Sequence, residues 1–66
     1  MDYTLITHGG FRFFRKKLSL KEQQDFVGGY IEICGNVISN EDGRLLNLPV
    51  NKLHPAFVGN IILFMK

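Results

Sequence analysis

Polar and apolar residues alternate over the first part of the chain, on either side of a glycine pair. The segments YTLIT and FRFFRKKL flank the sequence HGG. Alternation is typical of strands, and Gly9-Gly10 between two such runs predicts a two-residue hairpin loop. We therefore predict two extended segments, and in the second of them alternation places Phe11 and Phe13 on one face and Arg12 and Phe14 on the other.

The next pattern, SLKE, is typical of a helix start. The Ser19 side chain can accept a hydrogen bond from the amide of Glu22, whose carboxylate can reach back to the amide of Ser19, which is a capping box. We predict a short helix over residues 20–27. Its apolar positions, Leu20 and Val27, are expected to dock on a sheet.

Two adjacent glycines, Gly28 and Gly29, follow this helix and precede the alternating run YIEI. A nucleotide-binding loop has the order strand, glycines, helix, because amides at a helix N-terminus face the phosphate. Here the order is reversed, and the C-terminal end of a helix dipole disfavours an anion. Gly28 instead suits the left-handed conformation that closes a helix. We interpret the pair as a helix end that leads into a strand.

The run YIEICGNVIS predicts a second hairpin with Gly35-Asn36 as its two-residue loop. This register pairs Cys34 with Val37 and Ile33 with Ile38. Alternation then sorts the side chains as expected for a sheet covered on one side: Ile31, Ile33 and Ile38 on one face, and Tyr30, Glu32 and Ser39 on the other.

The sequence NEDGR predicts a further hairpin turn. Asn40 suits the first position of a type I turn and Gly43 the left-handed residue after it, which would bring Ile38 opposite Leu46. Pro49 would end that strand because it lacks a ladder donor. Asn51 can cap a single helical turn in the compact loop NKLHPAFVG.

The chain closes with the apolar run IILFM, which predicts a strand covered on both faces by the rest of the core or by another subunit. Residues 1–66 are thus expected to form a single α+β domain. Its architecture is a small antiparallel β-meander of about five strands, with one short helix packed on one face. Residues 1–18 form a basic β-hairpin, and residues 19–66 supply the helix, the meander and the closing strand.

The length of the chain, its single cysteine and its short apolar runs limit the kinds of protein that it can be. A chain of 66 residues can bury only a small core, and its single cysteine excludes an internal disulfide. We therefore expect a homo-oligomer, since a partner subunit is the remaining way to stabilise so small a domain. The longest apolar run is too short to span a bilayer and no signal peptide is recognisable, so we expect no membrane partner and a soluble, intracellular protein.

Positive charge is concentrated near the N-terminus, where five basic residues fall between positions 12 and 21. Basic residues interleaved with aromatic ones can contact phosphates while the rings stack on bases. The alternative is a sheet edge kept soluble by charge. The candidate nucleic-acid-binding residues are Phe11, Arg12, Phe14, Arg15, Lys16 and Lys17.

No arrangement of residues predicts catalysis, a metal site or a cofactor. Cys34 shares a predicted strand face with Glu32, and a neighbouring carboxylate opposes formation of the thiolate. The two histidines lack the spacing of a metal site, and the six acidic residues are scattered singly. Glu32 is expected either to contact a ligand or to pair with Arg44, Lys52 or a backbone donor. We expect a protein that is not an enzyme.

Several short motifs in residues 19–64 resemble an uncharacterised domain family of small proteins encoded by phages, plasmids and large DNA viruses. They are Val-Gly-Gly, Ile-Glu, Asn-Glu-Asp-Gly, Leu-Pro-Val-Asn and the closing Gly-Asn-Ile-Ile-Leu, in that order. Their candidate structural positions are Gly28, Gly29, Glu32, Asn40, Gly43, Pro49 and Asn51.

The resemblance implies an accessory protein of a mobile element, located in the host cytoplasm or nucleus if it is virus-encoded. Our first hypothesis is a non-enzymatic protein-interaction module that binds a host or viral protein. The alternatives are binding of nucleic acid through segment 11–17 and sequestration of a small nucleotide signal between subunits.

Overall fold

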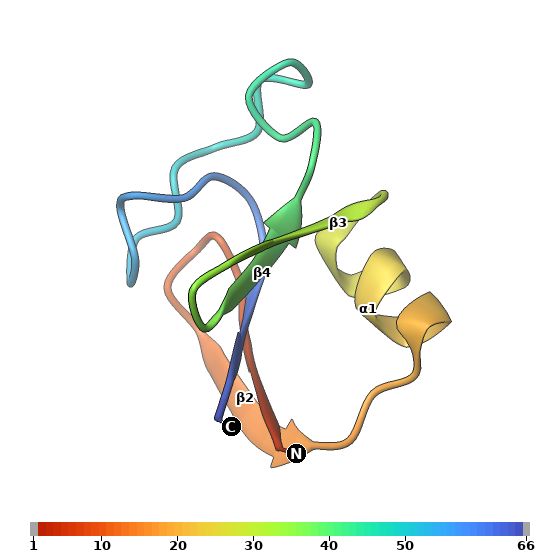
Figure 1. The fold of residues 1–66 in the computed structure, drawn as a ribbon. Helices are drawn as coiled ribbons and strands as arrows, with labels where there is room; N and C mark the ends of the chain where they lie inside the picture. The colour runs from red at the N-terminus through yellow and green to blue at the C-terminus, as the bar shows by residue number, and fades with distance from the viewer. Residues whose placement is uncertain (1, 66) are drawn as a thin grey trace.

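The computed structural model describes residues 2–65, except the side chains of Phe14 and Arg15. Within this range it contains a five-stranded antiparallel sheet and one short helix that packs against it (Figure 1). The predicted α+β class is confirmed. The elements in chain order are β1 (Tyr3–Ile6), β2 (Arg12–Lys16), α1 (Leu20–Val27), β3 (Ile31–Cys34), β4 (Val37–Asn40) and β5 (Ile61–Phe64).

The order of strands across the sheet is β2-β1-β5-β4-β3. Two local hairpins, β1–β2 and β3–β4, form the two sides, and the C-terminal strand β5 lies between them. β5 pairs antiparallel with β1, with Leu5 opposite Ile62, and with β4, with Ile38 opposite Ile62. The near-continuous apolarity of IILF suits this central place, where neither face of the strand meets solvent.

The first hairpin forms, but its loop is longer than the predicted two-residue Gly9-Gly10 loop. The amide of Thr7 donates to the carbonyl of Phe11 at 2.8 Å and closes a loop of residues 8–10, in which Gly10 has a φ of 96°. β2 is an outer strand of the sheet. The ladder shows an irregularity between Thr4 and Ile6. A bulge of this kind shifts the alternation of the partner strand.

The helix begins and ends where the sequence predicts. Ser19 Oγ accepts from the amide of Glu22 at 3.2 Å, and Glu22 Oε1 accepts from the amide of Ser19 at 3.0 Å. The hydrogen bond from the Ser19 amide lowers the pKa of Glu22 below its ordinary 4.5, and the Ser19 hydroxyl and Lys16 act in the same direction. At the other end Gly28 is left-handed, with a φ of 87°.

The face of the helix that docks differs in part from the prediction. Val27 is buried as expected, but Leu20 is exposed, so its predicted docking is wrong. Leu20 is the first helical residue and projects from the turn farthest from the glycines. Gln23 is buried instead, and its Nε2 donates to the carbonyl of Leu18 at 3.2 Å.

The two glycines after α1 lead into β3, so the interpretation of the pair as a helix end is confirmed. The amides of Gly28 and Gly29 both donate to the carbonyl of Gln24, at 2.9 and 3.0 Å. Gly29 also allows a close approach, because a Cβ there would lie 3.1 Å from Nδ2 of Asn40.

The β3–β4 hairpin has the predicted register, with Cys34 opposite Val37 and Ile33 opposite Ile38. The expectation of a sheet covered on one side is wrong, however. Ser39, predicted on the solvent face, is buried, whereas Ile33, predicted on the core face, is exposed. The reason is that segment 41–60 covers the second face, while the short helix does not reach Ile33.

The core accordingly consists of two clusters, one on each face of the sheet. Each contains residues of β1, β4 and β5, which makes these three strands the shared centre of the molecule. The cluster on the helix face contains Leu5, Val27, Ile38, Ile62 and Phe64. The cluster on the other face contains Ile6, Val37 and Ile61, with Phe57 and Leu63 packed against it.

No strand forms at Leu46–Leu48, so the predicted third hairpin is wrong. Asn40 does start a turn: its Oδ1 accepts from the amide of Asp42 at 2.8 Å. The chain then coils, and the amide of Leu48 donates to the carbonyl of Gly43, at 3.0 Å. Asn47 is left-handed at a φ of 57°, which completes a Schellman-type end.

The predicted role of Gly43 is also wrong, since Asn47, and not Gly43, has a positive φ. A Cβ on Gly43 would lie 2.8 Å from Cγ2 of Val58, so this position needs glycine for close packing. Pro49 ends no strand. Its carbonyl accepts from the amide of Gly59 at 2.6 Å, beside a bridge between Val50 and Val58.

Asn51 caps a turn, but no helical turn follows it. Its Oδ1 accepts from the amides of Leu53 and His54, at 3.0 and 3.1 Å. Its Nδ2 donates to the carbonyls of Gly59 and Thr7, at 3.0 and 3.3 Å. The side chain is fully buried, so Asn51 fastens segment 49–60 to the end of β1.

Candidate interaction surfaces

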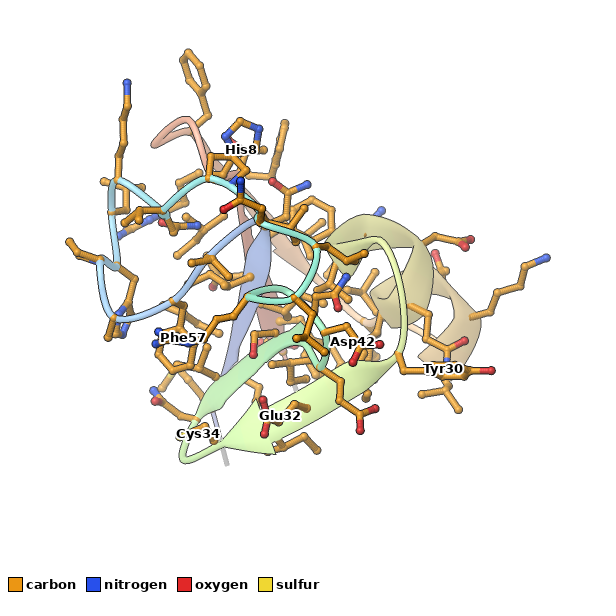
Figure 2. All side chains as sticks on the ribbon, turned by 90° about the horizontal axis from the view of Figure 1, so that it is seen from above. His8, Tyr30, Glu32, Cys34, Asp42 and Phe57 are labelled. Carbon is orange, nitrogen blue, oxygen red and sulfur yellow. The ribbon has the colours of Figure 1, made fainter. Side chains whose placement is uncertain are left out.

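A hollow of about 390 Å³ opens on the face of the sheet opposite the helix. One wall comes from β3 and β4, and the other from the coiled segment after β4 and from residues 56–58. Figure 2 shows Glu32, Cys34 and Phe57 around this region. We call it the hollow, and its lining residues are Glu32, Cys34, Ser39, Asn40, Glu41, Arg44, Leu45, Ala56, Phe57 and Val58.

The walls of the hollow are held by contacts that need specific residues. Gly43 lets the coiled segment approach Val58, as described above. Asn40 is buried, and its Nδ2 donates to the carbonyl of Val27 at 3.0 Å, which ties the end of β4 to the end of α1. The ring of Phe57 packs edge-on against His54, with centroids 4.9 Å apart.

The lining of the hollow is apolar on one side and charged at its rim. Leu45 is the most exposed large apolar residue among those described, at 86%. Leu45, Phe57 and Val58 form the apolar part of the lining. Glu32, Glu41 and Arg44 provide two negative charges and one positive charge at the rim. An apolar centre with a charged rim is the usual composition of a protein-binding surface.

Of the two charged partners predicted for Glu32, the fold places only one in the same hollow. Arg44 lines the same hollow, whereas Lys52 lies against Gly10, at the loop of the β1–β2 hairpin. Pairing of Glu32 with Arg44 stays a prediction. Cys34 is exposed and has no disulfide partner. Within residues 2–65, no three His, Cys, Asp or Glu side chains lie close enough together to hold a metal ion.

The basic segment occupies the outer strand β2 and the connection to the helix. Arg12, Lys16 and Lys17 are exposed, and Phe11 is exposed at 73%. The side chains of Phe14 and Arg15, which belong to the same predicted site, lie outside the described part of the structure. Because β2 forms an edge of the sheet, the side chains of Arg12 and Lys16 are in contact with solvent.

The fold also adds a residue to this basic edge that the sequence did not reveal. Lys52 follows Asn51 in the segment fastened to β1, and its amide donates to the carbonyl of His8 at 3.1 Å. A Cβ on Gly10 would lie 3.4 Å from Cβ of Lys52. The ring of Phe13, although it belongs to β2, does not extend this basic edge. It packs edge-on against Phe26 of the helix, with centroids 6.4 Å apart.

The run IILFM is covered by the rest of the core, which is one of the two alternatives predicted from its apolarity. Ile61, Ile62 and Phe64 are buried within one copy of the chain, and only Met65 is exposed. Any interface between copies must therefore use another part of the molecule. No helix in the described range is long and apolar enough to cross a bilayer.

Comparisons of this chain with protein-family models, with curated proteins and with solved structures find no match. The resemblance to the phage, plasmid and virus family therefore stays a prediction.

Proposed function

We propose that this protein is a non-enzymatic protein-interaction module that binds an extended segment of a partner protein at the hollow. The observation that carries the proposal is the hollow itself, with exposed Leu45 beside Phe57 and a rim of Glu32, Glu41 and Arg44. Burial of a leucine-sized side chain contributes about 2 kcal/mol, which makes Leu45 a suitable anchor.

Charge indicates the chemistry of the partner. The rim carries two carboxylates and one guanidinium, so its net charge favours a positively charged segment. We expect the partner to present a large apolar side chain to Leu45 and Phe57, with a lysine or arginine next to it that faces Glu32 and Glu41. Complementary charge at the rim supplies selectivity and faster association more than affinity.

Selection from a library of extended peptides tests this proposal. Wild-type protein should enrich peptides that combine an apolar residue with a neighbouring cation. Leu45→Asp should lose that enrichment and remain folded, because the side chain it replaces is mostly in solvent. Met65→Asp is the control for adding an acid at an exposed apolar position. Equal enrichment by wild type and Leu45→Asp, or none by either, would contradict the proposal.

Nucleic-acid binding is the second candidate function, because the fold favours it in one respect. β2 lies at an edge with Arg12, Lys16 and Lys17 exposed, and Lys52 joins it at the hairpin loop. Each phosphate neutralised by a cation releases counterions, so the affinity should fall steeply with salt.

Fluorescence anisotropy with labelled single-stranded and duplex oligonucleotides tests this candidate. Arg12→Glu combined with Lys17→Glu should abolish binding, whereas Lys21→Glu, on the exposed side of the helix, should have a small effect. Binding that is absent, or that does not change between low and high salt, would exclude the β2 edge as a nucleic-acid surface.

A further inference from the structure

The two outer strands of the sheet differ in how well they are protected. β2 carries Arg12 and Lys16, and charged side chains on an outer strand discourage pairing with another chain. β3 carries one charge, Glu32, between two isoleucines. Ile33 is exposed at 61%, although its neighbours in the same layer, Ile38 and Ile62, are buried. Of the two outer strands, β3 is therefore the one less protected against pairing with another chain.

The backbone groups that point outward from β3 can be assigned from the ladder. The amide of Glu41 donates to the carbonyl of Tyr30 at 2.8 Å, and Cys34 faces Val37 across the two-residue loop. Residues 30, 32 and 34 therefore turn their backbone groups toward β4. In an antiparallel ladder these groups alternate in direction, so the amides and carbonyls of Ile31 and Ile33 point away from the sheet.

We propose that β3 pairs antiparallel with β3 of a second copy of this chain, across a two-fold axis, and joins two five-stranded sheets into one. Such an interface is isologous, because the same strand serves both sides. It satisfies the outward-facing amide and carbonyl of Ile33 on both copies and covers the Ile33 side chain, which the short helix leaves exposed.

Side-chain alternation restricts the register of this pairing. Residues opposite each other in an antiparallel pair point to the same face, so one residue must lie on the two-fold axis opposite itself. Only two centres, Glu32 and Ile33, let three residues of each four-residue strand overlap. A centre at Glu32 would face two carboxylates directly, which is destabilising. We therefore assign the centre to Ile33, where the two isoleucines meet.

This register places the hollows of the two copies next to each other. With Ile33 on the axis, Glu32 of one copy lies opposite Cys34 of the other, on the face where both residues line the hollow. A two-fold axis perpendicular to the sheet preserves its faces, so the two hollows open on the same side of the dimer. The dimer does not depend on what the hollow binds, and it can be tested separately from the proposed function.

The interface is small, so the dimer should be weak and should dissociate on dilution. A single pair of four-residue strands lies well below the area of a standard protein interface. We expect sedimentation equilibrium of the wild type to show a monomer–dimer equilibrium that shifts toward dimer as the concentration rises. A strict monomer at every concentration would overturn the proposal.

A charge placed on the axis should break the dimer. Ile33→Lys puts two ammonium groups opposite each other, and the chain should remain folded because Ile33 lies outside both buried clusters. Met65→Lys is the matched control, since Met65 is exposed at 59%, close to the value for Ile33. The expected result is loss of dimer in Ile33→Lys alone. Equal self-association of both variants would overturn the proposal.

Disulfide trapping tests the register. In a Cys34→Ser background, Ile33→Cys places two sulfur atoms across the axis at a separation that a disulfide can bridge. Mild oxidation at high concentration should then trap a covalent dimer. The wild type should not be trapped, because Cys34 faces Glu32 of the other copy. Efficient trapping of the wild type, or none of the Ile33→Cys variant, would overturn the register.

Discussion

The two faces of the sheet are covered in different ways. On one face lies α1, a regular element that contributes Val27 to the core. On the other face lies segment 41–60, which has no helix and no strand beyond a single bridge (Figure 1). Both coverings bury apolar residues of β1, β4 and β5, so the sheet has a core on each side.

The irregular covering is fastened by polar side chains rather than by its own backbone ladder. Asn51 connects segment 49–60 to Thr7 at the end of β1. The Asn60 side chain makes two further connections: it accepts from the amide of His8 at 2.9 Å and donates to the carbonyl of Phe26 at 3.1 Å. Asn40, at the end of β4, holds the start of the segment, because its Oδ1 accepts from the amide of Asp42. Its Nδ2 donates to the carbonyl of Val27. Asn60 and Asn40 thereby satisfy carbonyls at the C-terminal end of α1, which have no partner within the helix.

The two faces of the sheet therefore depend on different kinds of interaction. The helix face should respond to the loss of apolar volume. The opposite face should respond to the loss of an asparagine amide, or of a glycine that permits close packing.

Asn51→Ala should have the largest effect, about 4 kcal/mol, because it leaves buried amides and carbonyls without partners. The side chain makes four hydrogen bonds and is fully buried. Urea unfolding followed by circular dichroism measures the change. Asn36→Ala, at the exposed tip of the β3–β4 hairpin, is the control and should change stability little. Similar values for the two variants would contradict a special role for Asn51.

Gly59→Ala should cost about 3 kcal/mol, from left-handed strain and from a clash. Gly59 has a φ of 74°, and an added Cβ would lie 2.8 Å from Cδ1 of Leu48. Gly35→Ala is a matched control, since Gly35 has a φ of 62° but nothing within 4 Å of the added Cβ. The difference between the two variants isolates the close packing. If they are equally destabilised, packing at Gly59 contributes nothing.

Val27→Ala should cost about 2 kcal/mol, through lost apolar burial and the cavity that remains. Val27 is the most buried apolar residue of α1. Leu20→Ala, on the same helix but exposed, should cost less than about 0.5 kcal/mol. Thermal unfolding compares them. A larger loss for Leu20→Ala than for Val27→Ala would show that the helix docks through its first turn after all.

The parts of the fold that follow from local sequence signals could be predicted, whereas the parts that depend on distant residues could not. The capping box, the closing glycine and the Gly35-Asn36 loop are local signals, and each marks a boundary that the structure reproduces. The Gly9-Gly10 pair also marks a hairpin, although its loop has one residue more than predicted. The insertion of β5 between β1 and β4 is non-local, and nothing near Ile61 specifies its partners. The coil at 41–48 cannot be told from a hairpin at its start, because Asn40 can begin either structure. The left-handed Asn47, which ends the coil, decides between them.

The two candidate surfaces also differ in whether the sequence could predict them. The basic edge could be predicted, because its residues are consecutive in the sequence. The hollow could not, because its walls come from residues 32–45 and 56–58, which approach only after segment 41–60 folds over the sheet. The one local signal is the pair of adjacent leucines at 45 and 46, next to a polar turn, and it equally fits the strand predicted there.

The smallest effect should be the pH dependence of the capping box, which belongs to the helix face. The pKa of Glu22 is lower in the folded chain than its ordinary 4.5, so the folded state binds fewer protons at this group. Its contribution to stability is therefore complete above that ordinary value and is lost as the pH falls through the lowered pKa. Glu22→Gln keeps an acceptor for the Ser19 amide but cannot titrate.

The stability difference between wild type and Glu22→Gln should thus be greatest at neutral pH and shrink in acid, as urea unfolding at several pH values would show. Lys16→Gln identifies the cause. Because the hydrogen bonds from Ser19 lower the pKa more than the charge of Lys16 does, the difference should largely persist in the Lys16→Gln background. If it disappears there, charge and not capping sets the pKa of Glu22. The helix start would then depend on β2 as well as on its own sequence.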